Sequence, residues 1–444
     1  MCSTAKWEAG DLEVLTRARR RLDRLRSSAY ASDIRTVATA AVISQALLLA
    51  ATPALTRLYT PADFGILAIF ISILGLAPIV ATFRYDIAIS LSKDRQESFQ
   101  TLTLCLFSTV FCAVAVAVLF ASPLLSGTSL GEMRGYWWLI GVGTFAVGSF
   151  TALNAWAGYA QKFKVVARVK IRQALSSVVT QLLFGVLTVG PLGLLVGYVM
   201  SQSYGASAFI LEIKRSQPKR FRITDLAVVA RKYRHFFYFA FPAGVINRLG
   251  IHIIPVLVGS FYTISAAGFF LLAQRLVALP TLVVGRAVAQ VYTNKLAKDS
   301  LADGVKLFPT YIRTVAALLA VGFIPMSLLA AFSPWLFEVI FGEDWRTAGV
   351  FCQLLVPAFY AQFAVAPMMQ TLNVLGYQRL QLVWDTLRLG AIFAVFATSQ
   401  FYKLSEQWAV GLVSATLFSA YILQFLLSVI AIKRRDERRD GDIT

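Results

Sequence analysis

Residues that build catalytic and metal sites are scarce in this chain of 444 residues. It contains 2 histidines and 4 cysteines, and Cys105 and Cys112 lie within one apolar run at a spacing that matches no metal motif. No nucleophile stands beside a base, and no glycine-rich loop of the kind that cradles phosphate is present. These absences argue against an enzyme, and they predict neither a bound metal nor a cofactor.

Charged residues are also few. They make up 15% of the chain, whereas hydrophobic residues make up 57% and the mean hydropathy is +0.67, which is more apolar than a soluble surface allows. Twelve apolar runs approach the roughly 20 residues that cross a bilayer as a helix. The predicted fold is an all-α polytopic membrane protein with about 12 transmembrane helices. These are expected at 36–57, 63–91, 99–122, 136–160, 169–189, 192–213, 237–260, 264–290, 309–332, 350–375, 380–401 and 408–432.

Acidic residues are outnumbered, with 23 Asp and Glu against 42 Lys and Arg and a net charge of +19. The excess follows the predicted topology, because the loops on one side of the membrane carry only Arg57, Arg134, Arg346 and Lys403. The opposite, basic side is predicted to be cytoplasmic, with both termini there and with no cleaved signal peptide in residues 1–35. A charge distribution that follows topology argues against a nucleic-acid partner.

One motif occurs twice, 203 residues apart. The stretch "LTRLYTPADFGILAIF" returns as "LVGSFYTISAAGFFLLA", with Tyr59, Thr60 and Gly65 of the first copy matched by Tyr262, Thr263 and Gly268 of the second. Both copies join two predicted helices on the same side of the membrane, which predicts two six-helix lobes related by an axis along the membrane normal. The expected divisions are a basic cytoplasmic N-terminal tail (1–35), an N-lobe (36–213), a basic cytoplasmic linker (214–236), a C-lobe (237–432) and a cytoplasmic C-terminal tail (433–444).

Five stretches together resemble the bacterial oligosaccharide and O-antigen flippases, the polysaccharide-transport branch of the multidrug, oligosaccharidyl-lipid and polysaccharide exporter superfamily. They are "LYTPADFGILAIF", "RYDIAISL", "FPAGVINRLG", "GFFLLAQRLVALP" and "FGEDWRTAG". The resemblance implies two lobes around a cavity that translocates undecaprenyl-pyrophosphate-linked oligosaccharides from the cytoplasmic to the periplasmic leaflet of the bacterial inner membrane. One departure is Asp86, where Glu is expected more often.

The same resemblance implies a role in making a surface polysaccharide such as O-antigen, capsule or exopolysaccharide. The implied partners are a lipid-linked oligosaccharide and membrane lipid, with a polysaccharide polymerase and a chain-length regulator as further candidates. Two alternatives stay open, a multidrug cation antiporter of the same superfamily and a lipid-linked peptidoglycan-precursor flippase. A cation antiporter should expose unpaired carboxylates, whereas the deep charges here are mostly Arg. The predicted outer loops are short, which argues against a glycosyltransferase or polymerase.

Cations within the predicted helices are the candidate substrate-binding residues. Arg248 and Arg275 each lie about 12 residues into a helix, roughly 16 to 18 Å from its nearer end. An Arg there costs roughly 2.5 to 3.5 kcal/mol unless it meets water or an anion, and its planar fork matches phosphate oxygens. Arg84 and Arg286, nearer the predicted cytoplasmic mouth, occupy nearly matching positions of the repeat. The alternative is that each Arg binds carbonyl groups or a hidden acid.

Three titratable residues are candidates for coupling transport to an ion, namely Asp86, His252 and Asp385. His252 lies four residues beyond Arg248, so the two share one helical face. Either carboxylate can carry a proton or sodium, unless a neighbouring Arg holds it ionised. Arg388 is three residues from Asp385 on the same face, and we expect the two to neutralise each other.

Overall fold

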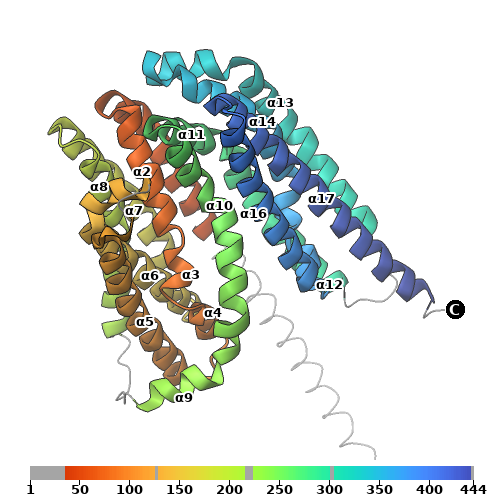
Figure 1. Ribbon diagram of the computed structural model, residues 1–444. Helices are drawn as coiled ribbons and strands as arrows, with labels where there is room; N and C mark the ends of the chain where they lie inside the picture. Colours follow the sequence, from red (N-terminus) through yellow and green to blue (C-terminus); the bar gives the residue numbers. More distant parts are fainter. Residues whose placement is uncertain (1–35, 126–128, 216–223, 301–304, 442–444) are drawn as a thin grey trace, which may run out of the picture.

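The computed structural model describes residues 36–125, 129–215, 224–300 and 305–441 (Figure 1). Every element in these ranges is a helix, and ten helices are long and apolar enough to cross a membrane. A bent pair, Ile264–Val277 with Thr281–Asp299, gives an eleventh, and helix α7 (Phe163–Val186) is equally long although its first half is basic. The predicted all-α polytopic fold is confirmed. The predicted tail 1–35 and part of the predicted linker lie outside the described residues.

The helices group into two halves. The first half contains the helix Thr36–Leu58, α2 (Pro61–Leu74), α3 (Ala77–Val80), α4 (Tyr85–Ser90), α5 (Arg95–Ala121), α6 (Trp137–Tyr159), α7 and α8 (Leu192–Arg215). A short helix, α9 (Thr224–Lys232), precedes the second half. That half contains α10 (Phe241–Phe261), α11 (Ile264–Val277), α12 (Arg286–Asp299), α13 (Phe308–Phe341), α14 (Arg346–Val365), α15 (Gln370–Val374), α16 (Gln378–Phe401) and α17 (Glu406–Gly441).

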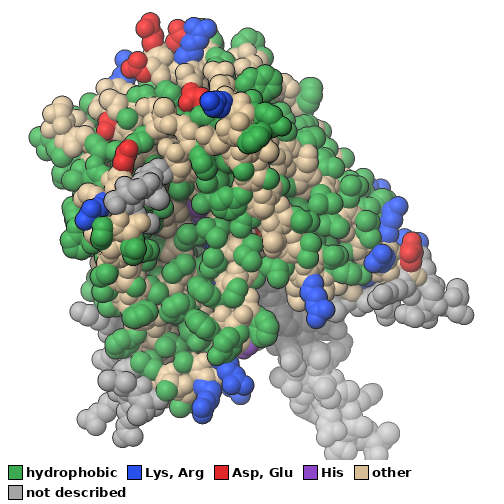
Figure 2. All heavy atoms as spheres, viewed as in Figure 1, with side chains coloured by type: hydrophobic (Ala, Val, Ile, Leu, Met, Phe, Trp, Pro, Cys, Tyr) green, Lys and Arg blue, Asp and Glu red, His purple; other side chains and the backbone are tan. Residues whose placement is uncertain are grey.

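The two halves form two bundles that meet at one end of the molecule. Helix α2 of the first bundle packs along α11 and α10 of the second, and these contacts make up most of the packing between the bundles. From this joined end the bundles diverge toward the open end, where α9 and α12 lie (Figure 1). Hydrophobic side chains cover most of the visible sides, and Lys and Arg are visible at the open end (Figure 2).

The repeated motif builds the joined end. Thr60 and Thr263 each cap the N-terminus of a helix, because their hydroxyl groups accept from the backbone N–H of Asp63 and Ala266 at 3.2 and 3.0 Å. The glycine that follows each cap by five residues lies against the other copy of the motif. A Cβ at Gly268 would overlap the carbonyl oxygen of Pro61. The two copies therefore recur because each supplies one side of the same helix crossing.

An indole ring closes the same end. Trp345, in the turn between α13 and α14, is 1% exposed, and its Nε1–H donates to the carbonyl oxygen of Thr56 at 3.2 Å. Its ring stands edge-on to Phe64 of α2 and to Phe269 of α11, with centroids 4.9 and 6.1 Å away. Aromatic pairs of this geometry stabilise by more than their buried area. The stretch "FGEDW" thus fastens the second bundle to the first.

The second predicted span, 63–91, is not one continuous helix. It divides into α2, α3 and α4, and Phe83 and Arg84 between α3 and α4 both have left-handed backbones, with φ of 47° and 66°. This conformation is energetically unfavourable for residues other than glycine, so it persists only where the surrounding structure imposes it. The eighth predicted span is also interrupted, because α11 and the helix that follows it are bent by 52° around Pro280 and a π-helical turn, Thr281–Gly285.

One set of polar contacts stabilises the open end of each bundle. Lys232, at the end of α9, forms an ion pair with Glu97 of α5, which raises the pKa of Lys232 through this hydrogen bond. In the second bundle, Asp436 accepts from the backbone N–H of Leu307 at 3.1 Å and of Phe308 at 3.3 Å, at the start of α13. Helix α17 continues to Gly441, beyond residue 432, where the last predicted span ends.

Candidate functional site

Three of the predicted substrate-binding residues lie within electrostatic range of one another or of a shared tyrosine where the bundles face each other. Arg248 of α10 lies within electrostatic range of Arg84, which precedes α4, and of Tyr198 on α8. Arg275 of α11 interacts with the same Tyr198. The first bundle thus contributes Arg84 and Tyr198, and the second contributes Arg248 and Arg275. We call Arg84, Arg248 and Arg275 the arginine cluster.

No member of the arginine cluster forms an ion pair within the described part of the chain. Asp86 is the acid in range of Arg84 and Arg248, but its carboxylate accepts from the hydroxyl of Thr82 at 2.9 Å in the first turn of α4. The Nε of Arg84 is buried and has no hydrogen-bond partner among the described residues. A Cβ at Gly244 of α10 would lie 3.0 Å from that Nε, so glycine at this position makes room for the guanidinium group.

Arg286 lies apart from the cluster, at the start of α12, and is exposed. It is within electrostatic range of Lys170, a half-buried residue of α7 in the opposite bundle. Sequence analysis did not single out Lys170, because it is one of five basic residues within 162–172. The helical periodicity could have distinguished Lys170 from Arg168 and Arg172, because it places Lys170 on the opposite side of the helix. Cations of the two bundles therefore lie opposite each other both at the arginine cluster and nearer the open end.

Asp385 lies in a different place, inside the second bundle. Its Oδ1 accepts from Arg388 at 3.1 Å and from the side-chain amide of Asn247 at 2.7 Å. Both charged side chains are less than a tenth exposed, and the Arg388 guanidinium lies 4.4 Å from the ring centre of Trp384. The predicted pairing of Asp385 with Arg388 is confirmed. Helix α10 presents Asn247 to this buried pair and the next residue, Arg248, to the opposite bundle.

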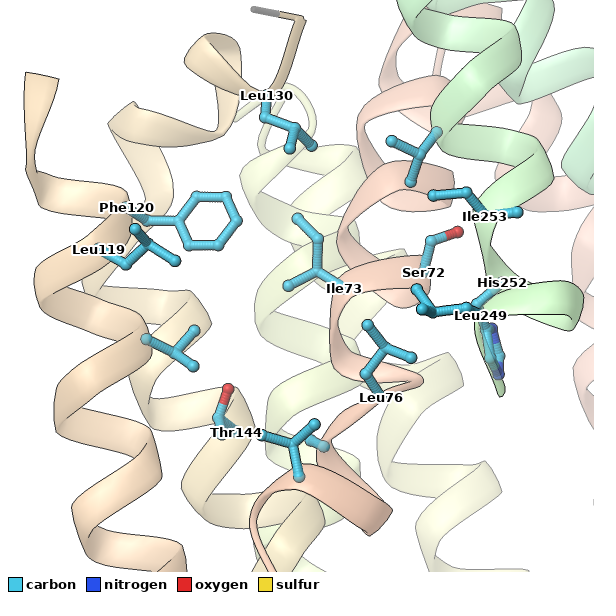
Figure 3. Close-up of a pocket in the computed structure, with 14 residues that line it drawn as sticks. Ser72, Ile73, Leu76, Leu119, Phe120, Leu130, Thr144, Leu249, His252 and Ile253 are labelled. Atoms are coloured by element: carbon cyan, nitrogen blue, oxygen red, sulfur yellow. The ribbon is translucent and has the colours of Figure 1, made fainter. Parts of the chain in front are cut away.

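His252 borders an apolar cavity of about 300 Å³ between α5 and α6 on one side and α2 and α10 on the other (Figure 3). Apart from Ser72 and Thr144, the other residues that line this cavity are hydrophobic. The imidazole also packs on Gly75 at the end of α2, where an added Cβ would lie 2.5 Å from the ring. His252 is thus held at the boundary between the bundles, within electrostatic range of Arg248. No group of three His, Cys, Asp or Glu that could hold a metal exists among the described residues.

A family model described as "Polysaccharide biosynthesis protein" matches residues 54–349, which contain the arginine cluster and both copies of the repeat. The chain belongs to this family. Among curated proteins, the teichuronic acid biosynthesis protein TuaB of Bacillus subtilis (strain 168) is 24% identical over 195 residues. That match covers 43% of this chain and 40% of TuaB, so the chain aligns with less than half of its relative.

Two solved structures share the fold of this family member. The lipid II flippase MurJ in an inward closed conformation has a TM-score of 0.69 at 13% identity, covering 90% of each chain. An inward-facing multidrug resistance transporter of the MATE family and MOP superfamily has a TM-score of 0.67 at 13% identity, covering 88% of this chain and 96% of the other. The predicted family is confirmed, and this member is a multi-pass membrane protein of polysaccharide biosynthesis that shares the fold of these two structures.

Proposed function

We propose that this protein is a flippase for undecaprenyl-pyrophosphate-linked oligosaccharides, and that it moves them from the cytoplasmic to the periplasmic leaflet during synthesis of a surface polysaccharide. The observation that carries the proposal is the arginine cluster, in which cations of both bundles lie near one another and form no ion pair in the described chain. Its ligand is the pyrophosphate, while the oligosaccharide follows between the bundles and the polyprenyl tail stays in lipid.

The chemistry of the cluster supports an anionic substrate. A guanidinium group offers two parallel N–H donors to phosphate oxygens, and these bonds strengthen where water is excluded. Because an uncompensated Arg inside a membrane is costly, an anion that passes the cluster recovers part of this cost. A cationic drug would be repelled instead, which disfavours the multidrug antiporter. A peptidoglycan-precursor flippase remains the second candidate, since the fold likeness to MurJ and the same anionic logic favour it.

We further propose that the open end faces the cytoplasm and that both termini lie on that side of the bacterial inner membrane. The excess of Lys and Arg in the connections near α7, α9 and the end of α17 supports this orientation. The two lobes, 36–213 and 237–432, then alternate between the present inward-facing arrangement and one that opens at the joined end. We place Asp86, His252 and Arg286 along this path because of their electrostatic coupling to Arg248 and Lys170, whereas Asp385 pairs with Arg388 inside the second lobe.

Complementation tests the function. In a strain that lacks its own flippase, the double variant Arg248→Ala, Arg275→Ala should fail to restore surface polysaccharide at matched protein levels. Loss of a charge-assisted contact should weaken binding of undecaprenyl pyrophosphate by roughly tenfold to a hundredfold per residue. The matched control is Lys295→Ala, Lys298→Ala, which removes two exposed cations of α12 and should complement fully. Full activity of the Arg248, Arg275 double variant would refute the proposal.

A further inference from the structure

A second set of cations lies outside the path between the bundles, in a groove between α7 and α8 of about 560 Å³. The groove is lined by Arg168 and Arg172 of α7, by Tyr204 of α8 and by apolar side chains that include Val165 and Leu211. Arg172 donates to the hydroxyl of Tyr204 at 3.2 Å. Because Arg168 and Arg172 are four residues apart on one helix, both guanidinium groups reach the same part of the groove.

The charge of this groove is not balanced by the described protein. Neither Arg168 nor Arg172 forms an ion pair with an acidic residue in the described ranges. Glu212 also lines the groove, but its carboxylate is bound by Lys162 at 3.0 Å. Both arginines are exposed, and the groove keeps a net positive charge that an anion would complement.

The position of the groove indicates an anion that carries a hydrocarbon chain. Helix α7 begins at the open end, so Arg168 and Arg172 lie about 8 and 14 Å along its axis from Phe163. On the same helical face, farther from the open end, an apolar stripe is left exposed by Leu175, Val179, Leu183 and Val186, which are between 46% and 70% exposed. A cationic pair followed by an exposed apolar stripe matches a lipid headgroup followed by its acyl chain.

We propose that the groove between α7 and α8 binds an anionic phospholipid of the leaflet at the open end, with the lipid phosphate between Arg168, Arg172 and the hydroxyl of Tyr204. The acyl chain lies along Leu175 and Val179. This site is separate from the arginine cluster, because Lys170, which faces the opposite bundle, lies on the other side of α7. The bound lipid compensates two arginines that otherwise meet the hydrocarbon boundary unpaired.

Native mass spectrometry of the delipidated full-length protein tests the site, with dioleoyl phosphatidylglycerol as the probe and zwitterionic dioleoyl phosphatidylcholine as its comparison. The wild type should retain phosphatidylglycerol preferentially. The double variant Arg168→Gln, Arg172→Gln should retain it roughly tenfold or more weakly, because each basic residue near an anionic headgroup contributes to its affinity. The matched control, Lys295→Gln with Lys298→Gln, should behave like the wild type.

Two milder changes keep the test valid if the double variant folds poorly. Arg168→Lys with Arg172→Lys keeps both charges and should preserve most of the preference for phosphatidylglycerol, whereas Tyr204→Phe should lower retention by about threefold or more. Unchanged retention in Tyr204→Phe together with Arg168→Gln, Arg172→Gln would overturn the proposal. Displacement of phosphatidylglycerol by millimolar inorganic phosphate would overturn it in favour of a soluble anion. Preferential occupation by undecaprenyl pyrophosphate, lost in the same double variant, would overturn it in favour of the transported lipid.

Discussion

Replacing Gly268 by alanine should shift the protein away from the arrangement in which the bundles are joined. At this glycine, α11 crosses the start of α2 with no room for a side chain. An added Cβ would overlap the carbonyl oxygen of Pro61 and would lie 2.8 Å from the backbone nitrogen of Gly65. Ordinary contacts of carbon with other heavy atoms lie near 3.5 Å, so the two helices must separate by roughly 1 Å.

The energy of this change follows from the packing. Overfilling a tight contact costs about 1 to 3 kcal/mol, and the nearest atoms to the added Cβ are backbone atoms that cannot rotate away. An arrangement in which the joined end has opened makes no such contact and does not carry this cost. The ratio of joined to opened molecules should therefore fall by about 5-fold to 150-fold.

Spin labels on two residue pairs measure the shift. Leu124 and Tyr402 are exposed at the joined end, on the first and second bundle respectively, and Lys164 and Lys295 are exposed at the open end. In a background without native cysteines, Gly268→Ala should lengthen the distance between the labels at Leu124 and Tyr402. The distance between the labels at Lys164 and Lys295 should shorten.

The matched control is Gly390→Ala in α16, where an added Cβ meets no atom within 4 Å. This change should leave both distance distributions as in the wild type. If Gly268→Ala folds in normal yield and its distributions also match the wild type, the helix crossing does not govern the relative position of the bundles, and the reasoning is refuted.

Three further predictions concern single residues. Arg388→Ala leaves the buried carboxylate of Asp385 without its counter-ion and should destabilise the protein by about 3 to 5 kcal/mol, which a lower Tm in detergent would show. Removing both charges together should recover part of this lost stability. Asp436→Ala removes the acceptor at the start of α13 and should cost about 1 kcal/mol, measured against Glu437→Ala, which should leave the Tm unchanged. Lys170→Gln should reduce surface polysaccharide in the complementation assay without lowering the Tm, and a Tm loss with unchanged activity would contradict a role in the path.

Much of the architecture could be predicted because membrane insertion leaves a direct signal in the sequence. Continuous apolar runs predicted the helices, since a backbone in lipid must satisfy its own hydrogen bonds. The pairing of Asp385 with Arg388 followed from helical spacing alone. Asn247 and Tyr198 could not be found in this way, because each acquires its partner from a helix that is distant in sequence. Lys170 was not singled out for another reason, since it lies among several other basic residues in the first half of α7.

The interruptions in the helices extend the internal repeat beyond the motif that first showed it. The first bundle breaks its second span at Phe83 and Arg84, and a shift of 203 residues carries these positions to 286 and 287, beside the π-helical turn that ends at Gly285. In each half an arginine lies at the interruption, Arg84 within it and Arg286 directly after it, at the start of α12. An interrupted helix frees backbone groups that only a polar environment can satisfy, so both interruptions belong where the bundles face each other rather than lipid. The repeat therefore gives each bundle one side of the tight helix crossing and one broken helix with an arginine, and these are the parts that two lobes would need in order to alternate around an anionic headgroup.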